Sequence, residues 1–296
     1  MTDGNVRELP QPIQGKKEFS ICYTVDSFAD GIAFGQHRME KGLDPRDYYF
    51  LHLPNDTEVV QLRSRYVLNP RNPFAELEAH LTRLARQGVL RSSTVYLGTS
   101  TDPFFPFEGK FDSSMKFLQL FQKYTPGLLV VQTRSPLIVI AMPVFKKLGV
   151  QAAVTIGIET NQEEVVERYT PGLPRVGERL KTAAALRKLG VEVTLQVCPV
   201  LPYGDWRADA HSFAELLAAH ADYIYVRSIT DGSERVEKKI RNSTLSRRLV
   251  EDRKFHYLRP DSANPLITAI EKIAPEKLRI PARAQLEPKQ MQMFVA

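Results

Sequence analysis

The stretch TVYLGTSTDPFFPFE, residues 94–108, decides the predicted fold. A short apolar run ends at Gly98, and a polar cluster follows before Pro103 turns the backbone: Thr99, Ser100, Thr101 and Asp102. In an α/β protein, ligands are usually held by polar groups at the carboxyl end of a buried strand. Taken alone, these residues also suit an ordinary turn. Their significance depends on whether the same layout recurs.

The same layout recurs at three later strand ends. The residues there are Thr133, Arg134 and Ser135 in VQTRSP, Glu159 and Thr160 in IGIETN, and the turn residues of CPVLPYGDW, 198–206. Each apolar strand delivers polar or turn-forming residues at its carboxyl end. This is the pattern of a ligand site ringed by βα loops.

The chemistry of these side chains suggests a role for each. We expect Arg134 to pair with a ligand carboxylate, and Asp102 and Glu159 to hold an amine or ribose hydroxyls. Thr99 and Ser100 would donate short hydrogen bonds. For any one residue alone, a structural interpretation is favoured, with Arg134 as a solvated loop charge and Glu159 as a helix N-terminal acid. Together, these polar residues at the ends of neighbouring strands form a polar ring that favours a binding site.

The rest of the chain alternates strands with helices. Predicted strands cover 19–25, 47–53, 94–97, 127–133, 151–160, 191–202 and 221–229. Predicted helices cover 73–88, 113–124, 136–149 with a proline inside it, 163–169, 175–190 and 212–220. Between the first two strands we expect a loop over 26–38 and a helix that ends near Gly42. This alternation argues for βαβ units with a parallel sheet, closed as a barrel or partial barrel.

The composition is that of an ordinary globular protein. The chain has 296 residues, 43% of them hydrophobic and 25% charged, which suits one large domain or two medium ones. No apolar run reaches the roughly 18 residues of a membrane span, and the start lacks a signal peptide's apolar core, so we expect a cytoplasmic protein without membrane contact. Cys22 and Cys198 fit no metal spacing, and the histidines form no ligand motif, so no metal site is expected.

Three segments, in order, resemble the radical S-adenosylmethionine superfamily, and specifically its spore photoproduct lyase-like branch. They are LGTSTDPFFPFE (97–108), VQTRSPLI (131–138) and residues 154–202. The resemblance spans 19–229 and is strongest over 94–206. It implies a partial (β/α)6 barrel of the TIM type.

The resemblance also implies a ligand, S-adenosylmethionine or a related nucleoside. The stretch after Gly98 would face the amino and carboxylate end of that ligand. Thr133, Arg134 and Ser135 would match a segment that contacts the methionine or ribose portion. Glu159 and Thr160 would lie where the family approaches the nucleoside.

The sequence departs from that superfamily after the first strand. Members carry a CxxxCxxC motif there, because three thiolates hold three irons of a 4Fe–4S cluster. If the motif is placed by its distance to the next helix, Ser27, Gly31 and Phe34 occupy its three cysteine positions. If the first cysteine is Cys22 instead, Asp26 and Ala29 occupy the other two positions. Either way at most one thiolate is present, so we expect no iron–sulfur cluster. Two outcomes stay open: a pseudoenzyme that binds a nucleoside-like ligand, and a scaffold whose polar ring is a relic.

A basic segment, residues 235–259, follows the predicted barrel. Its cations include Lys238, Lys239, Arg241, Arg247, Arg248, Arg253 and Lys254. With Phe255, His256 and Tyr257 beside them, they would grip a phosphate backbone and stack a base. A solvated helix face is the alternative. The net charge of +6, and the resemblance to a branch that acts on damaged DNA, favour DNA or RNA as the partner.

The end of the chain resembles the short bacterial peptide that binds the sliding clamp. In such peptides a glutamine and an apolar pair enter a pocket of the clamp. The matching residues here are Gln290, Met291, Met293 and Phe294. The alternative is a terminal segment that packs Met293 and Phe294 on the body of the protein.

The predicted organisation has four parts. They are a flexible arm (1–17), a radical S-adenosylmethionine-like partial barrel (18–230), a basic helical extension (231–282) and a tail (283–296). We expect a cluster-less pseudoenzyme that binds nucleic acid in a DNA repair context. One alternative is an enzyme that uses Asp102, Arg134 and Glu159 for non-radical chemistry on S-adenosylmethionine or a nucleotide. Another is a scaffold that binds the sliding clamp through its tail.

Overall fold

The computed structural model describes residues 19–28, 31–37, 66–67, 73–98, 102–104, 110–230, 232, 234–241 and 243–279. Within these residues, nine strands form one sheet in the order β3-β2-β1-β4-β5-β6-β7-β8-β9. The strands are β1 (Phe19–Phe28), β2 (Gly31–His37), β3 (Tyr66–Val67), β4 (Ser93–Leu97), β5 (Leu128–Thr133), β6 (Ala152–Gly157), β7 (Glu192–Val197), β8 (Tyr223–Val226) and β9 (Leu278–Arg279).

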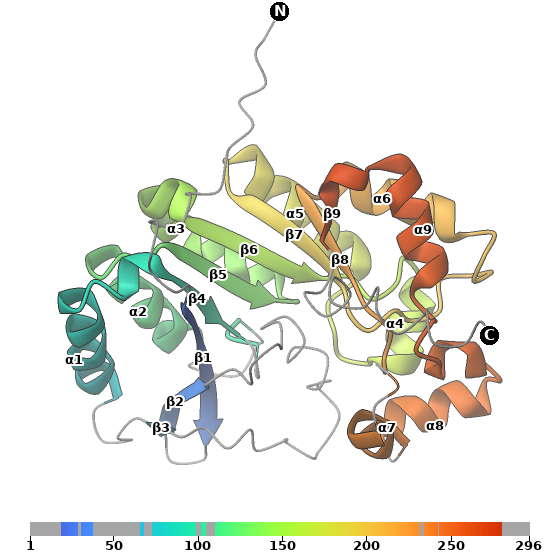
Figure 1. Ribbon diagram of the computed structural model, residues 1–296, viewed down its shortest axis with the longest axis horizontal. Coiled ribbons are helices and arrows are strands. Elements are labelled where there is room, and N and C mark those ends of the chain that lie inside the picture. Colours follow the sequence, from blue (N-terminus) through green and yellow to red (C-terminus); the bar gives the residue numbers. More distant parts are fainter. Residues whose placement is uncertain are drawn as a thin grey trace, which may run out of the picture.

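From β1 onward through β4 to β9, each strand pairs in parallel with the next. Spatial order follows chain order, as it does when successive βα units wind in one direction. The six longer strands of this run, β1 and β4 to β8, form the twisted wall of an open barrel with helices packed against it (Figure 1). The predicted partial (β/α)6 barrel with a C-terminal extension is confirmed.

The helices connect the parallel strands and form the C-terminal extension (Figure 1). They are α1 (Pro73–Arg86), α2 (Lys110–Lys123), α3 (Met142–Leu148), α4 (Glu163–Tyr169), α5 (Val176–Lys188), α6 (Ala210–His220), α7 (Glu234–Arg241), α8 (Thr244–Glu251) and α9 (Asn264–Ile273). One prediction was wrong, because residues 136–149 do not form a single helix. A 3-10 helix, Pro136–Ala141, precedes α3, in which Pro143 lies in the first turn. A proline there breaks no helical hydrogen bond.

The chain after the first predicted strand also differs from the prediction. The sequence predicts a loop over 26–38, but β1 continues to Phe28 and β2 folds back on it, with Phe28 opposite Gly31. Ile32 and Phe34 alternate with small residues, and this period of two is the period of a strand. The alternation therefore outweighs the glycines and aspartates that suggest a loop.

Several predicted segments lie outside the described residues. They are the arm 1–17, the helix end near Gly42, the strand over 47–53 and the tail 283–296. In the part of the chain that the structure describes, no helix has the length and apolar character needed to cross a bilayer.

The hydrophobic core lies between the sheet and the helices. Val95 and Leu97 of β4 point into it and are fully buried. The same core cluster includes Leu249 of α8, Ile270 of α9 and Tyr257, which lies between those helices. Full burial of one such aliphatic side chain stabilises the fold by roughly 1.5–3 kcal/mol. The shared core therefore fixes the basic segment against the barrel.

Candidate functional site

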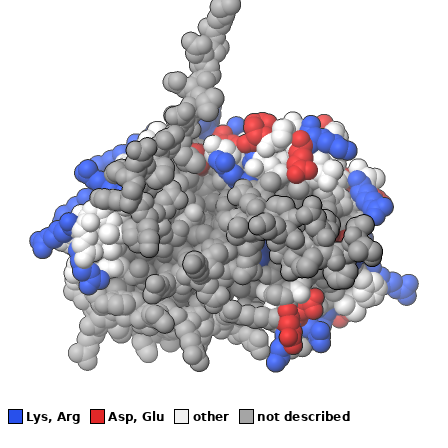
Figure 2. Space-filling model, in the orientation of Figure 1, with Lys and Arg blue, Asp and Glu red and all other residues white. Residues whose placement is uncertain are grey.

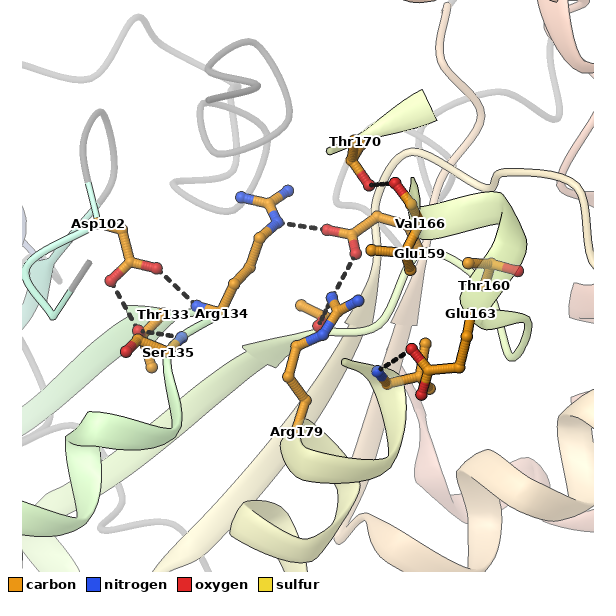
Figure 3. A network of polar contacts seen from close by, with 12 residues as sticks. Asp102, Thr133, Arg134, Ser135, Glu159, Thr160, Glu163, Val166, Thr170 and Arg179 are labelled. Carbon is orange, nitrogen blue, oxygen red and sulfur yellow. Dashed lines mark hydrogen bonds and ion pairs between the residues drawn. The ribbon is translucent and has the colours of Figure 1, made fainter. Parts of the chain in front are cut away.

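The carboxyl ends of β4, β5 and β6 bring most of the predicted polar residues together (Figure 3). Thr133 is the last residue of β5, and Arg134 and Ser135 follow it. Glu159 follows β6, whose Ile156 lies opposite Thr133. Parallel strands in register end at the same edge of a sheet, which explains the meeting of these residues. Thr99, Ser100 and Thr101 lie outside the described residues, so their ligand role stays a prediction.

Gly98 is required by the backbone at this edge. Its φ is +94°, in the left-handed region that favours glycine. A Cβ atom would lie 2.3 Å from the carbonyl oxygen of Gln132 and 2.9 Å from Cδ of Pro103. Any side chain here would push β4 away from β5, which accounts for Gly98 without a ligand.

Asp102 joins the ends of β4 and β5 (Figure 3). Its Oδ1 accepts hydrogen bonds from the Thr133 hydroxyl at 2.7 Å and the Phe104 N–H at 3.0 Å, and its Oδ2 accepts from the Arg134 N–H at 2.7 Å. The Thr133 hydroxyl in turn accepts from the Ser135 N–H at 2.9 Å. Burial raises the pKa of Asp102, and the donors, led by the Arg134 N–H, act in the opposite direction. The carboxylate thus shapes the loop after β5.

Glu159 lies between two guanidinium groups (Figure 3). The Nε of Arg134 donates to Oε1, and Nη1 of Arg179 donates to Oε2 at 2.7 Å and to the carbonyl of Gly157 at 2.7 Å. The side chains of Arg134, Glu159 and Arg179 are 3%, 1% and 0% exposed. We call these three residues the buried triad.

The charges of the buried triad favour an ionised carboxylate. Burial acts to raise the pKa of Glu159, but Arg134 and Arg179 outweigh it and hold that pKa below its ordinary range. The triad also needs a glycine in β6. A Cβ on Gly157 would lie 3.0 Å from Cγ of Arg134 and 3.0 Å from Oε1 of Glu159. The end of β6 is therefore shaped to let the two side chains meet.

Sequence reasoning missed Arg179. It lies in α5 among Val176, Leu180 and Ala183, which are all buried. Residues three and four apart share one helix face, so Arg179 stands in an apolar stripe. A cation in such a stripe requires a buried partner, and this signal would have pointed to a carboxylate.

Thr160 and the end of β6 are tied to the loop after β7. The Thr160 hydroxyl donates to the carbonyl of Pro202 at 2.6 Å and accepts from the Gln162 N–H at 3.1 Å. The Leu201 N–H donates to the carbonyl of Glu159 at 2.9 Å. Both hydrogen-bonding roles of this hydroxyl are thus used within the protein.

The strand-end acids have protein partners at every oxygen. Each oxygen of Asp102 and of Glu159 accepts at least one hydrogen bond from the chain. A ligand amine or ribose would have to reach these buried oxygens beside the protein donors. Buried polar atoms nearby that have no partner among the described residues include the amide of Gln132, Oδ1 of Asn161, and Nε and Nη2 of Arg179. A water molecule or ligand would satisfy them, so the predicted ligand site stays a prediction.

The predicted basic segment forms α7, α8 and a 3-10 helix, η5 (Phe255–Leu258). Its cations differ in exposure: Lys238, Arg241, Arg247 and Arg253 are exposed, Arg248 and Lys254 are half-buried, and the Lys239 side chain lies outside what the structure describes. None of the described cations in this set forms an ion pair with a described acidic residue. Figure 2 shows basic and acidic side chains side by side at the lower right, where Figure 1 has α7 and α8.

Two acidic residues of the segment, Glu251 and Asp252, are turned toward α4. Arg168 of α4 donates to both oxygens of Asp252 at 2.9 Å and to Glu251 at 3.0 Å. The Tyr169 hydroxyl donates to Asp252 at 2.7 Å. Arg248 donates to the backbone carbonyl of Arg168 at 2.9 Å, so it has a structural role. We call this set of contacts the α4–α8 clamp.

Comparison with known proteins finds similarity in solved structures. No family model matches the chain, and no curated protein matches it. A tyrosine-to-phenylalanine mutant of spore photoproduct lyase is 15% identical with a TM-score of 0.50, over 79% of this chain and 72% of that one. A cysteine-to-serine mutant of the same enzyme is 14% identical with a TM-score of 0.50, over 82% and 79%.

The chain has a fold similar to that of spore photoproduct lyase. The resemblance that the three sequence segments predict is therefore confirmed at the level of the fold. Identity of this order does not carry function, which has to be argued from the residues of this chain.

The resemblance to spore photoproduct lyase implies an iron–sulfur cluster, and the residues of this chain do not fit one. The sequence holds two cysteines, whereas the cluster motif needs three. Cys198 is fully buried after β7, and Cys22 lies in β1, opposite Tyr96 of β4. Ser27 and Gly31 belong to the β1–β2 hairpin and offer no thiolate. Among the described residues, no three His, Cys, Asp or Glu side chains are grouped to hold a metal ion.

Proposed function

We propose that this protein binds nucleic acid through α7, α8 and η5 and does not carry out cluster-dependent radical chemistry. The arrangement of charge in the basic segment carries the proposal. Two of its three acids, Glu251 and Asp252, are engaged by Arg168 in the α4–α8 clamp, while Lys238 and Arg247 are exposed. The clamp therefore leaves more exposed cations than unclamped acids in this segment.

Exposed cations that form no ion pair with the acidic residues that the structure describes suit a phosphate backbone. Each Lys or Arg that contacts a phosphate releases condensed counterions, which makes binding favourable and dependent on salt. The similarity in fold to spore photoproduct lyase, an enzyme named for a photoproduct, supports a DNA repair context. The branch that the sequence resembles acts on damaged DNA, which points the same way.

The strand-end network argues against the alternative of a non-radical enzyme. A catalytic acid or base needs an oxygen that reaches the substrate. Every oxygen of Asp102 and Glu159 accepts a hydrogen bond from the protein, and the buried triad is almost fully enclosed. These contacts support a structural role for both acids.

The proposal is tested by fluorescence anisotropy with labelled oligonucleotides over a series of salt concentrations. Combining Lys238→Ala with Arg247→Ala should weaken binding and reduce the slope of log K against log salt by about 1.4–1.8, because two phosphate contacts are lost. The matched control combines Lys146→Ala with Lys181→Ala, which removes the same charge from exposed positions of α3 and α5. Absence of salt-dependent binding by the wild type, or equal losses in both double variants, would contradict the proposal.

A further inference from the structure

An aromatic cluster lies where η5 meets the loop before α6. The ring centroids of Trp206 and His256 are 5.2 Å apart, and those of His256 and Tyr257 are 4.4 Å apart. The indole N–H of Trp206 donates to the carbonyl of Ser262 at 2.8 Å, which fixes the ring. The guanidinium of Arg207 lies 5.6 Å from the centroid of Trp206. Tyr257 is fully buried, so the half-buried rings of Trp206 and His256 form the accessible aromatic platform, with a cation beside it.

Phe255 precedes this cluster in η5 and is exposed to solvent. Its side chain is 55% exposed, although it is directly followed by His256 of the cluster. Burial lowers the pKa of His256, and the charges of Lys254 and Arg259 act in the same direction against that of Asp205. A single exposed apolar residue is common, but this one follows two cations and precedes two aromatic residues in the sequence. That combination is typical of surfaces that stack nucleic-acid bases.

The backbone at Arg253 indicates that its cation has a use. After α8, the Arg253 N–H donates to Val250 and the Lys254 N–H donates to Leu249, which is the Schellman arrangement. Arg253 has φ of +57°, where glycine is the favoured residue. A side chain retained in a costly backbone conformation motivates a functional hypothesis for that side chain.

A groove continues from the platform between α6 and α9. It has a volume of about 490 Å³, and its lining includes Trp206, Arg207, His211 and Lys272. Sites for small ligands usually span about 300–1,000 Å³. Asp261, the acid in the lining, is paired with Arg259 at 3.0 Å. The groove therefore offers an aromatic wall and two cations of its own, Arg207 and Lys272.

We propose that η5, the Trp206 platform and the α6–α9 groove together bind a single strand of nucleic acid by base stacking. The inference rests on the proposed function and names the form of nucleic acid that it takes. Bases in a duplex are already stacked on each other, whereas a single strand leaves their faces open to aromatic side chains. One base stacks on Phe255, and the strand continues past Trp206, with phosphates toward Arg253, Arg207 and Lys272.

Two variants test the inference in the same anisotropy assay. Phe255→Ala should weaken binding of a single-stranded oligonucleotide by at least about fivefold, because one stacked base is lost. Arg253→Gly should weaken binding and yet raise the urea midpoint of unfolding, because glycine suits the positive φ. If Arg253 had only a structural role, the binding affinity and the urea midpoint would change in the same direction. Val150→Ala, at another exposed apolar position, is the control and should change neither.

The outcomes separate the two proposals. Wild-type affinity in Phe255→Ala, or tighter binding of duplex than of single strand, would overturn the stacking inference. If the double variant of Lys238 and Arg247 still lowers the salt slope in that case, the proposed function stands. Failure of the wild type to bind any oligonucleotide would overturn both.

Discussion

At the scale of single residues, Glu159 is the most constrained side chain of the strand-end network. It is 1% exposed and bonded to both Arg134 and Arg179. The sequence predicts that Arg134 and Glu159 lie in a polar site, because each follows the carboxyl end of a predicted strand. They do not predict that the two side chains would bind each other, because that depends on Arg179 entering from α5.

Replacing Glu159 tests this account. Glu159→Gln leaves two buried guanidinium groups without a counter-charge, so we expect the free energy of unfolding to fall by about 3–5 kcal/mol. Urea unfolding followed by circular dichroism measures the loss. Glu178→Gln makes the same change at an exposed position of α5 and should be nearly neutral. A loss in Glu159→Gln no larger than in this control would show that the buried triad does not stabilise the fold.

At the scale of elements, the α4–α8 clamp connects the barrel to the basic segment. Hydrogen bonds from Arg168 and Tyr169 lower the pKa of Asp252 from 3.8 to about 2. For an acid with a lowered folded-state pKa, the stabilisation is present above the unfolded pKa and is lost as pH falls through the folded one. The window for this clamp therefore runs from about pH 4 down to about pH 2.

The pH dependence of Asp252→Asn follows from this window. At neutral pH the variant should melt at a lower temperature than the wild type, because the bonds to Arg168 lose their charge. The difference should shrink as pH falls from about 4 toward about 2, where the wild-type carboxylate also becomes neutral. Thermal unfolding at a series of pH values measures it, with Glu164→Gln of α4 as the control. A difference that stays constant down to pH 2 would contradict the role of Asp252.

The elements also show where sequence reasoning succeeds and where it stops. The barrel strands and most helices were predictable, because apolar periodicity and the glycines that end helices are local signals. The β1–β2 hairpin was not, because Gly31 and Asp30 suggest a loop and only the alternation of Ile32 and Phe34 indicates a strand. The engagement of Asp252 by Arg168 was also beyond prediction, since the two residues are 84 positions apart.

At the scale of the whole molecule, the chain combines a barrel similar to spore photoproduct lyase with a hairpin where the cluster motif would lie. The barrel is stabilised by its core and by the buried triad, neither of which needs iron. The basic segment shares that core, so the proposed nucleic-acid binding would not depend on a cluster either. We therefore propose that this protein keeps the fold without the radical chemistry.

Anaerobic reconstitution with iron and sulfide, followed by metal analysis after desalting, tests this separation most directly. We expect iron and sulfide at background levels, because two cysteines, one of them fully buried, cannot supply three thiolates. We also expect the same affinity for oligonucleotides before and after the treatment. Stoichiometric iron and sulfide, with reductive cleavage of S-adenosylmethionine, would contradict the account.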